Sequence, residues 1–271
     1  MTSPQVQPQS KFVEANGIRL HYNEWSTDGP PLIFLHGITG SSNSWDAIAP
    51  SFVDDYRVMA FDLRGHGQSG KLDSGYSWES DYAKDISTFI TERLHEPAIV
   101  VGHSLGAVVS VPVALQAGNA VRAIVMEDPP AFVHGDEDGP RNRFAPVLTL
   151  KALPLDQRIE ELMKTMNIDR VAATIRANNY GNMIESVLTE TFAGGVAYVP
   201  DDLLPKVACP TLVILGNPNR GGVVDWTERP RLQRLLKGSK ILEWPEVGHG
   251  IQSEAPERFI ATVSDFLKTL S

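Results

Sequence analysis

The pentapeptide Gly102-His103-Ser104-Leu105-Gly106 carries the clearest chemical signal in this chain. A run rich in β-branched residues precedes it at 97–101, and a stretch of mostly small and apolar residues suited to a helix follows it. This is the sequence form of a nucleophile elbow, in which a serine projects from a sharp turn between a strand and a helix. The two glycines would let the turn close, because a side chain there would meet the neighbouring strand and helix. The chemistry expected of such a serine is attack on an acyl carbonyl.

A serine nucleophile needs a general base, and His249 is the best candidate among the seven histidines. It lies between two glycines, after the last predicted strand and before the predicted C-terminal helix. His36 and His103 lie next to the predicted site, but we expect them to support its loops rather than to react. The sequence therefore predicts that Ser104 and His249 act as nucleophile and base.

Backbone amides are expected to stabilise the negative charge that develops on the substrate's carbonyl oxygen. Leu105 follows the nucleophile directly, and its N–H is the first expected donor of this oxyanion hole. Ile38, which follows His36-Gly37, supplies the second expected N–H. Both side chains are apolar, so they predict a dry pocket wall and an apolar substrate.

Short buried-type strands alternate with helices along most of the chain, and this alternation predicts how the site is held. We expect a mostly parallel central sheet with helices on both faces, which is an α/β fold. Ligands bind such sheets beyond the carboxyl ends of the strands. Four polar residues fall at predicted ends of this kind, namely His36, Asp62, Ser104 and Asp128. Near the N-terminus, Asn16-Gly17 between two apolar runs predicts a β-hairpin.

The alternation stops between residues 131 and 205, where the sequence predicts no strand. Apolar residues recur at helical spacing in 155–166, 168–175 and 184–192, which predicts three helices. The expected organisation is a disordered tail over 1–10, an α/β core over 11–130 and 206–271, and a helical cap over 131–205.

Composition excludes several classes of function. The 271-residue chain has a net charge of −9, which argues against nucleic acid or an anionic membrane as partner. The single cysteine excludes an internal disulfide framework, and no metal-binding spacing is present. Residues 1–10 lack the apolar segment of a signal peptide, and no apolar run is long enough to span a membrane. We therefore expect a soluble, cytoplasmic protein with a small-molecule substrate.

Beyond the tail, the chain resembles the α/β-hydrolase fold family in its form with a helical cap. The matching segments are His36-Gly37, residues 62–69, the elbow at Ser104 and Gly248-His249-Gly250. The family's chain order of nucleophile, acid and histidine also fits. The resemblance implies a serine-histidine-acid triad, an acyl-enzyme intermediate, and no metal or organic cofactor.

The acid of the triad is where this chain departs from the family's usual pattern. Members often carry a Gly-x-x-Asp turn after the next-to-last strand, but here Asn219 occupies the place of that aspartate, and an amide has no negative charge. Some capped members place the acid one strand earlier, where this chain has Glu127-Asp128. Adjacent strand residues face opposite ways, so only one of the two can face the base. The analogy favours Asp128, with Asp225 and Glu127 as the alternatives.

The expected activity is hydrolysis of a carboxylic ester or lactone by a serine hydrolase. The serine at the elbow does not fit the haloalkane dehalogenases and epoxide hydrolases of this fold, which use an aspartate there. Leu105 stands where prolyl iminopeptidase-like members tend to carry tryptophan, which argues against an aminopeptidase. Two alternatives stay open: a C–C bond hydrolase with the same triad, and a small-molecule receptor that retains the triad.

Overall fold

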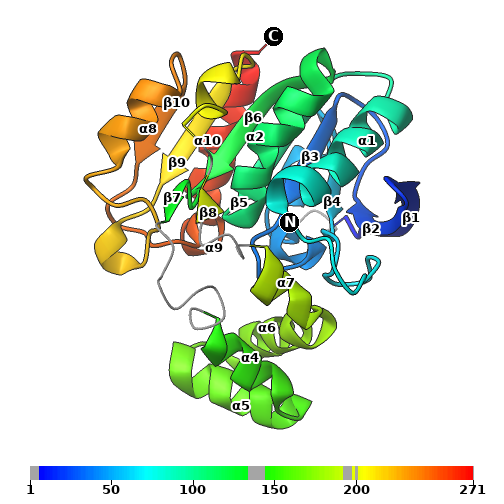
Figure 1. Cartoon of the computed structure of the whole chain (residues 1–271), viewed down its shortest axis with the longest axis vertical. Coiled ribbons are helices and arrows are strands. Elements are labelled where there is room, and N and C mark those ends of the chain that lie inside the picture. The colour runs from blue at the N-terminus through cyan, green and yellow to red at the C-terminus, as the bar shows by residue number, and fades with distance from the viewer. Residues whose placement is uncertain (1–5, 134–143, 192–196, 199–200, 271) are drawn as a thin grey trace, which may run out of the picture.

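A computed structural model describes residues 6–133, 144–191, 197–198 and 201–270 of the protein (Figure 1). Its centre is an eight-stranded sheet in the order β1-β2-β4-β3-β5-β6-β9-β10. The six strands from β4 to β10 in that order pair in parallel, and β1 and β2 pair antiparallel at one edge. The predicted α/β fold class is confirmed. The strands are β1 (Gln9–Ala15), β2 (Ile18–Glu24), β3 (Pro31–Leu35), β4 (Arg57–Phe61), β5 (Ala98–His103), β6 (Val121–Glu127), β9 (Thr211–Leu215) and β10 (Lys240–Glu243).

The predicted hairpin is formed by β1 and β2. Asn16 and Gly17 both have positive φ angles, 51° and 72°, which a two-residue turn between twisted antiparallel strands requires. The first strand begins at Gln9, which pairs with Glu24. Residues 9 and 10, expected to belong to the tail, are therefore part of the sheet.

The central strands are buried on both faces, as parallel strands between helical layers must be. In β3, Ile33 and Leu35 belong to one hydrophobic cluster, while Leu32 and Phe34 belong to the cluster on the opposite face. The first cluster is covered by α1 (Ala83–Arg93), α2 (Leu105–Ala117) and α8 (Arg229–Leu235). The second is covered by α10 (Pro256–Lys268). In Figure 1, α2 and α10 accordingly lie on opposite sides of the sheet.

Several short helices supplement these layers. The predicted helix after Ser77 begins with one π-helical turn, Trp78–Tyr82, before it continues as α1. The hydroxyl of Ser77 accepts a hydrogen bond from the N–H of Ser80, as expected of an N-cap. The other short helices were not predicted: α9 (Ile251–Glu254) and the 3₁₀ turns Ser42–Trp45, Ala49–Phe52, Gly118–Ala120, Leu204–Lys206 and Pro218–Arg220.

Residues 144–191, between β6 and β9, are described as four α-helices and are called here the helical insertion. They are α4 (Ala145–Ala152), α5 (Leu155–Met166), α6 (Arg170–Asn182) and α7 (Glu185–Glu190). Figure 1 shows α4, α5 and α6 stacked together outside the sheet. Their contact is a small apolar core of its own, made by Ile159, Leu162, Ala173, Ala177 and Tyr180.

The prediction that residues 131–205 hold no strand is wrong. Phe132–Val133 (β7) and Ala197–Tyr198 (β8) pair antiparallel, one on either side of the helical insertion. Two-residue strands are too short to leave a periodic pattern in the sequence.

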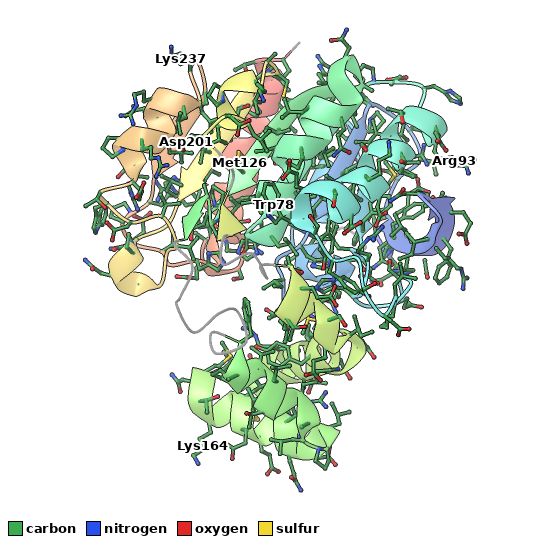
Figure 2. All side chains as sticks on the ribbon, viewed as in Figure 1. Trp78, Arg93, Met126, Lys164, Asp201 and Lys237 are labelled. Carbon is green, nitrogen blue, oxygen red and sulfur yellow. The ribbon has the colours of Figure 1, made fainter. Side chains whose placement is uncertain are left out.

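Of the described helices, none is long and apolar enough to cross a membrane. Figure 2 adds the side chains and shows Met126, near the end of β6, in the middle of the molecule.

Candidate active site

Ser104 stands in the turn between β5 and α2, with φ 52° and ψ −111°. A non-glycine residue rarely adopts a positive φ, so this conformation is strained. The surrounding glycines are sterically required. A Cβ on Gly102 would lie 2.2 Å from the carbonyl of Gly106, and a Cβ on Gly106 would lie 2.2 Å from the carbonyl oxygen of Leu35. The turn thus has the geometry expected of a nucleophile elbow.

His249 is held by a buried carboxylate. Its Nδ1 lies 2.7 Å from Oδ2 of Asp128, whose side chain is completely buried while the imidazole is 31% exposed. In the neutral imidazole, a proton on Nδ1 that is donated to the carboxylate leaves Nε2 unprotonated. This is the tautomer that a base acting on a serine needs.

Asp128 is itself fixed by backbone donors. The N–H of Gly216 donates to its Oδ1 at 3.0 Å, and the N–H of Val223 donates to its Oδ2 at 2.9 Å. Both donors belong to the loop after β9, where relatives often carry the acid. A buried carboxylate with three hydrogen bonds has its charge compensated and its orientation set.

The two alternative acids lie elsewhere. Glu127 has a different partner from His249, because its Oε1 accepts a hydrogen bond from the N–H of Gln252 at 2.8 Å. Burial raises the pKa of Glu127 well above its ordinary value. Asp225 is exposed, and its carboxylate accepts hydrogen bonds from the N–H and the hydroxyl of Thr227, which lower its pKa. Among the predicted acids, the structure brings Asp128 to the histidine.

His103 links the elbow to the histidine loop. Its Nε2 lies 3.0 Å from the carbonyl oxygen of His249, and the two imidazole rings are 4.7 Å apart. Burial, with the charges of His249, His36 and Arg176 in that order, holds the pKa of His103 well below the ordinary value, which favours the neutral ring. This contact brings the loop that carries His249 beside the residue that precedes Ser104.

The loop of the predicted oxyanion hole lies against the elbow. The N–H of Gly106 donates to the carbonyl of His36 at 3.1 Å, and a Cβ on Gly37 would lie 3.2 Å from Cβ of Ser104. Within the described residues, the N–H groups of Ile38 and Leu105 have no hydrogen-bond acceptor. Buried backbone donors are normally paired, so these two are available to a bound oxygen.

His36 orients the peptide that carries the Ile38 N–H. Burial lowers the pKa of His36 to about 3, so the ring is neutral. Its Nε2 accepts a hydrogen bond from the N–H of Leu63 at 3.0 Å, which places the proton on Nδ1. Nδ1 then donates to the carbonyl of Gly37 at 2.7 Å. That carbonyl and the Ile38 N–H belong to the same peptide unit, so His36 fixes the donor.

Asp62 organises the loops behind the site and makes no contact with His249. Its carboxylate accepts hydrogen bonds from the N–H of Ser42 at 2.6 Å, the N–H of Gln68 at 2.8 Å and Nδ1 of His21 at 2.8 Å. Burial raises its pKa, but these hydrogen bonds outweigh that effect and hold the pKa below the usual range.

Within the described part of the chain, no group of three or more His, Cys, Asp or Glu side chains is arranged to hold a metal ion.

Comparison with known proteins identifies the family of this chain. Residues 32–262 match the sequence model of the alpha/beta hydrolase family. The chain is 27% identical to 2-(acetamidomethylene)succinate hydrolase of Mesorhizobium japonicum, over 95% of both proteins. It is 25% identical to N-formylmaleamate deformylase of Pseudomonas putida, over 94% of this chain and 95% of that protein. A crystal structure of E-2-(acetamidomethylene)succinate hydrolase matches with a TM-score of 0.82 at 25% identity, over 96% of this chain and 99% of that one. The chain belongs to the alpha/beta hydrolase family.

Proposed function

We propose that Ser104, His249 and Asp128 form a catalytic triad, and that the protein is a serine hydrolase that cleaves a carboxylic ester or a lactone. One observation carries the proposal. A serine in a strained turn lies next to a loop whose histidine donates Nδ1–H to a buried carboxylate 2.7 Å away.

In the first half of the reaction, Ser104 Oγ attacks the acyl carbon while Nε2 of His249 accepts its proton. Asp128 stabilises the imidazolium that forms. The N–H groups of Ile38 and Leu105 donate to the oxyanion, and each such donor typically lowers the barrier by about 3–4 kcal/mol. The C–O bond to the leaving group then breaks, and the leaving oxygen takes the proton from His249.

In the second half, water attacks the acyl-enzyme. His249 accepts a proton from the water, and the same two N–H groups hold the second oxyanion. Breakdown of this intermediate returns the proton to Ser104 and releases the acid. Apart from the substrate, neither half of the reaction needs any group other than the protein and water.

The helical insertion would act as the cap over this site. Its helix α6 is attached to the core beside the oxyanion loop: the hydroxyl of Ser41 donates to Oδ1 of Asn179 at 3.1 Å. A cap in this position would keep bulk solvent away from the reacting groups while it admits the water that hydrolyses the acyl-enzyme, and it would select the substrate. The two relatives named above are, by their names, enzymes that act on small molecules, which supports a small-molecule substrate here.

Hydrolysis of p-nitrophenyl butyrate by the wild type, Ser104→Ala and Ser110→Ala tests the proposal. Ser110 is a matched control, because it lies on α2 and donates only within its own helix, to the carbonyl of Ala107. We expect many turnovers per chain in the wild type and in Ser110→Ala, and a loss of at least about 10³-fold in Ser104→Ala. Full turnover in Ser104→Ala would contradict the proposal, and so would a folded wild type that completes no more than one turnover, as a receptor would.

A further inference from the structure

Arg176, on helix α6 of the helical insertion, is half-buried and has no hydrogen-bond or ion-pair partner within the described residues. Arg158 on the neighbouring helix α5 is a contrasting case, because its donors are used within the protein. It is 8% exposed, and its guanidinium donates to the carbonyls of Leu150, Lys151, Leu153 and Ala177. A partly desolvated guanidinium is costly unless its five donors are used. None of the described residues uses the donors of Arg176, which leaves them available to a bound ligand.

The stripe of α6 that carries Arg176 faces the core domain. Residues three and seven positions along a helix share one face, and here these are Asn179 and Met183. Asn179 is hydrogen-bonded to Ser41, and Met183, the C-cap residue that directly follows α6, is buried in the same hydrophobic cluster as Ile38 and Leu105. Arg176 thus lies on the side of α6 that packs over the oxyanion loop.

Asn179 fixes that stripe firmly. Besides the hydrogen bond from Ser41, its Oδ1 accepts from Nδ2 of Asn43 at 3.2 Å, and its Nδ2 donates to Oδ1 of Asn43 at 3.2 Å. Asn43 lies only five residues after Ile38 in the chain. Two reciprocal amide hydrogen bonds hold one turn of α6 against this loop, and Arg176 is one turn away from it.

The charge of Arg176 contributes, after burial and the charges of His249 and His36, to the lowered pKa of His103, the residue before the nucleophile. The carboxylates at the end of β6 are already engaged: Asp128 accepts three hydrogen bonds, and Glu127 accepts one from the N–H of Gln252. Among the described residues, Arg176 is therefore a cation above the oxyanion loop with no carboxylate paired to it.

We propose that Arg176 binds a carboxylate of the substrate, so that the enzyme prefers small acyl compounds bearing a second, free carboxylate. The inference rests on the proposed hydrolase function and deepens it. A guanidinium binds a carboxylate through two parallel charge-assisted hydrogen bonds, which fixes orientation as well as affinity. The fairly apolar substrate expected from the sequence is replaced by one that is apolar near Ile38 and Leu105 and anionic at its far end.

A pair of esters with the same carbon chain isolates this effect. Monomethyl glutarate carries the free carboxylate and dimethyl glutarate does not, and the hydrolysis of both can be followed by proton release. The variants are Arg176→Gln and, as matched control, Arg170→Gln, an exposed arginine at the start of the same helix. Glutarate serves as a competitive inhibitor of p-nitrophenyl butyrate hydrolysis, which gives a binding readout that does not depend on cleavage of the anionic ester.

We expect Arg176→Gln to lower kcat/KM for monomethyl glutarate by about 10- to 100-fold, in line with one lost charged contact. Its kcat/KM for dimethyl glutarate should stay within about twofold of the wild type, which also shows that the variant folds. The inhibition constant of glutarate should rise by a similar factor, and Arg170→Gln should change neither quantity.

Two results would separate the failure of this inference from the failure of the proposed function. If the wild type hydrolyses both esters and Arg176→Gln changes them equally, Arg176 does not recognise a carboxylate although the chain is an esterase. If glutarate binds the wild type and not Arg176→Gln, measured by calorimetry, while no ester is cleaved, the anion site stands and the esterase proposal falls.

Discussion

His249 donates its Nδ1–H to Oδ2 of Asp128 across 2.7 Å, although 121 positions separate the two residues in the chain. The strand order explains the meeting, because β6, which ends before Asp128, lies between β5 and β9. The loop after β9 then packs closely on the histidine loop: a Cβ on Gly216 would lie 2.0 Å from the carbonyl oxygen of Gly248. The carboxylate that follows β6 can therefore reach the histidine, although relatives often place the acid on the loop after β9.

The first prediction concerns this acid. Asp128→Asn should lower kcat by about 10³–10⁴-fold, because an amide cannot stabilise the imidazolium or hold the required tautomer. Asp225→Asn is the matched control and should keep wild-type activity, since its carboxylate is exposed and bonded to Thr227. Turnover of p-nitrophenyl butyrate by both variants shows which carboxylate is the acid of the triad. The reverse ranking of the two variants would move the acid to the later loop.

The second prediction concerns pH. Burial keeps His36 neutral with a pKa of about 3, and it also lowers the pKa of His66 and of His103. Because their pKa values are lowered, these three rings favour the neutral form, and the proposed mechanism needs only one deprotonated base. The ascending limb of log kcat/KM against pH, measured from pH 5 to 9, should have a slope of about one, for one ionisation. A slope near two would show that a second group must also lose a proton.

The third prediction uses the raised pKa of Glu127. As pH rises above the ordinary glutamate value, the unfolded chain loses this proton while the folded chain keeps it, so the free energy of unfolding falls with pH until the folded pKa is passed. Glu127→Gln removes the difference and keeps the shape of the side chain. Its Tm relative to wild type should therefore be higher at pH 8 than at pH 5, by calorimetry. The exposed Glu92→Gln serves as control, and an equal difference at both pH values in Glu127→Gln would count against a buried neutral acid.

The fourth prediction concerns Arg158, which joins α5 to the carbonyls of α4 and α6. Arg158→Met leaves these buried acceptors without donors, at a cost of about 1–3 kcal/mol to the stability of the helical insertion. Lys164→Met is the control, because Lys164 is exposed on the same helix and projects from its outer side (Figure 2). Hydrogen–deuterium exchange should speed up in α4 to α6 for Arg158→Met alone. Unchanged exchange there would show that the guanidinium is not what holds these helices together.

Much of the fold was predictable because its signals are local. The Asn16-Gly17 turn, the buried strands and the strongly amphipathic α5 each follow from residue type and spacing. Helix α4 was missed because it has only eight residues and its apolar side chains lie around most of its circumference, so no helical period stands out. The ladder of β7 and β8 depends on contacts between distant segments.

The site was predictable to the extent that its residues lie in motifs. Ser104 and His249 lie in glycine-containing motifs that predict tight turns, whereas the choice of Asp128 depended on analogy. What orients Asp128 is a pair of backbone N–H groups, at Gly216 and Val223, which no residue type encodes. A single arginine on an amphipathic helix likewise resembles an ordinary solvent-facing residue, so Arg176 could be recognised only once the helix was placed.

Covalent labelling of the nucleophile tests the central claim most directly. The wild type is treated with a fluorophosphonate, its activity on p-nitrophenyl butyrate is followed, and the modified peptide is identified by mass spectrometry. One adduct per chain, on Ser104, with activity falling in proportion to labelling, is the predicted result. Undiminished turnover by chains fully labelled at Ser104, or inactivation through an adduct on another residue, would contradict the account.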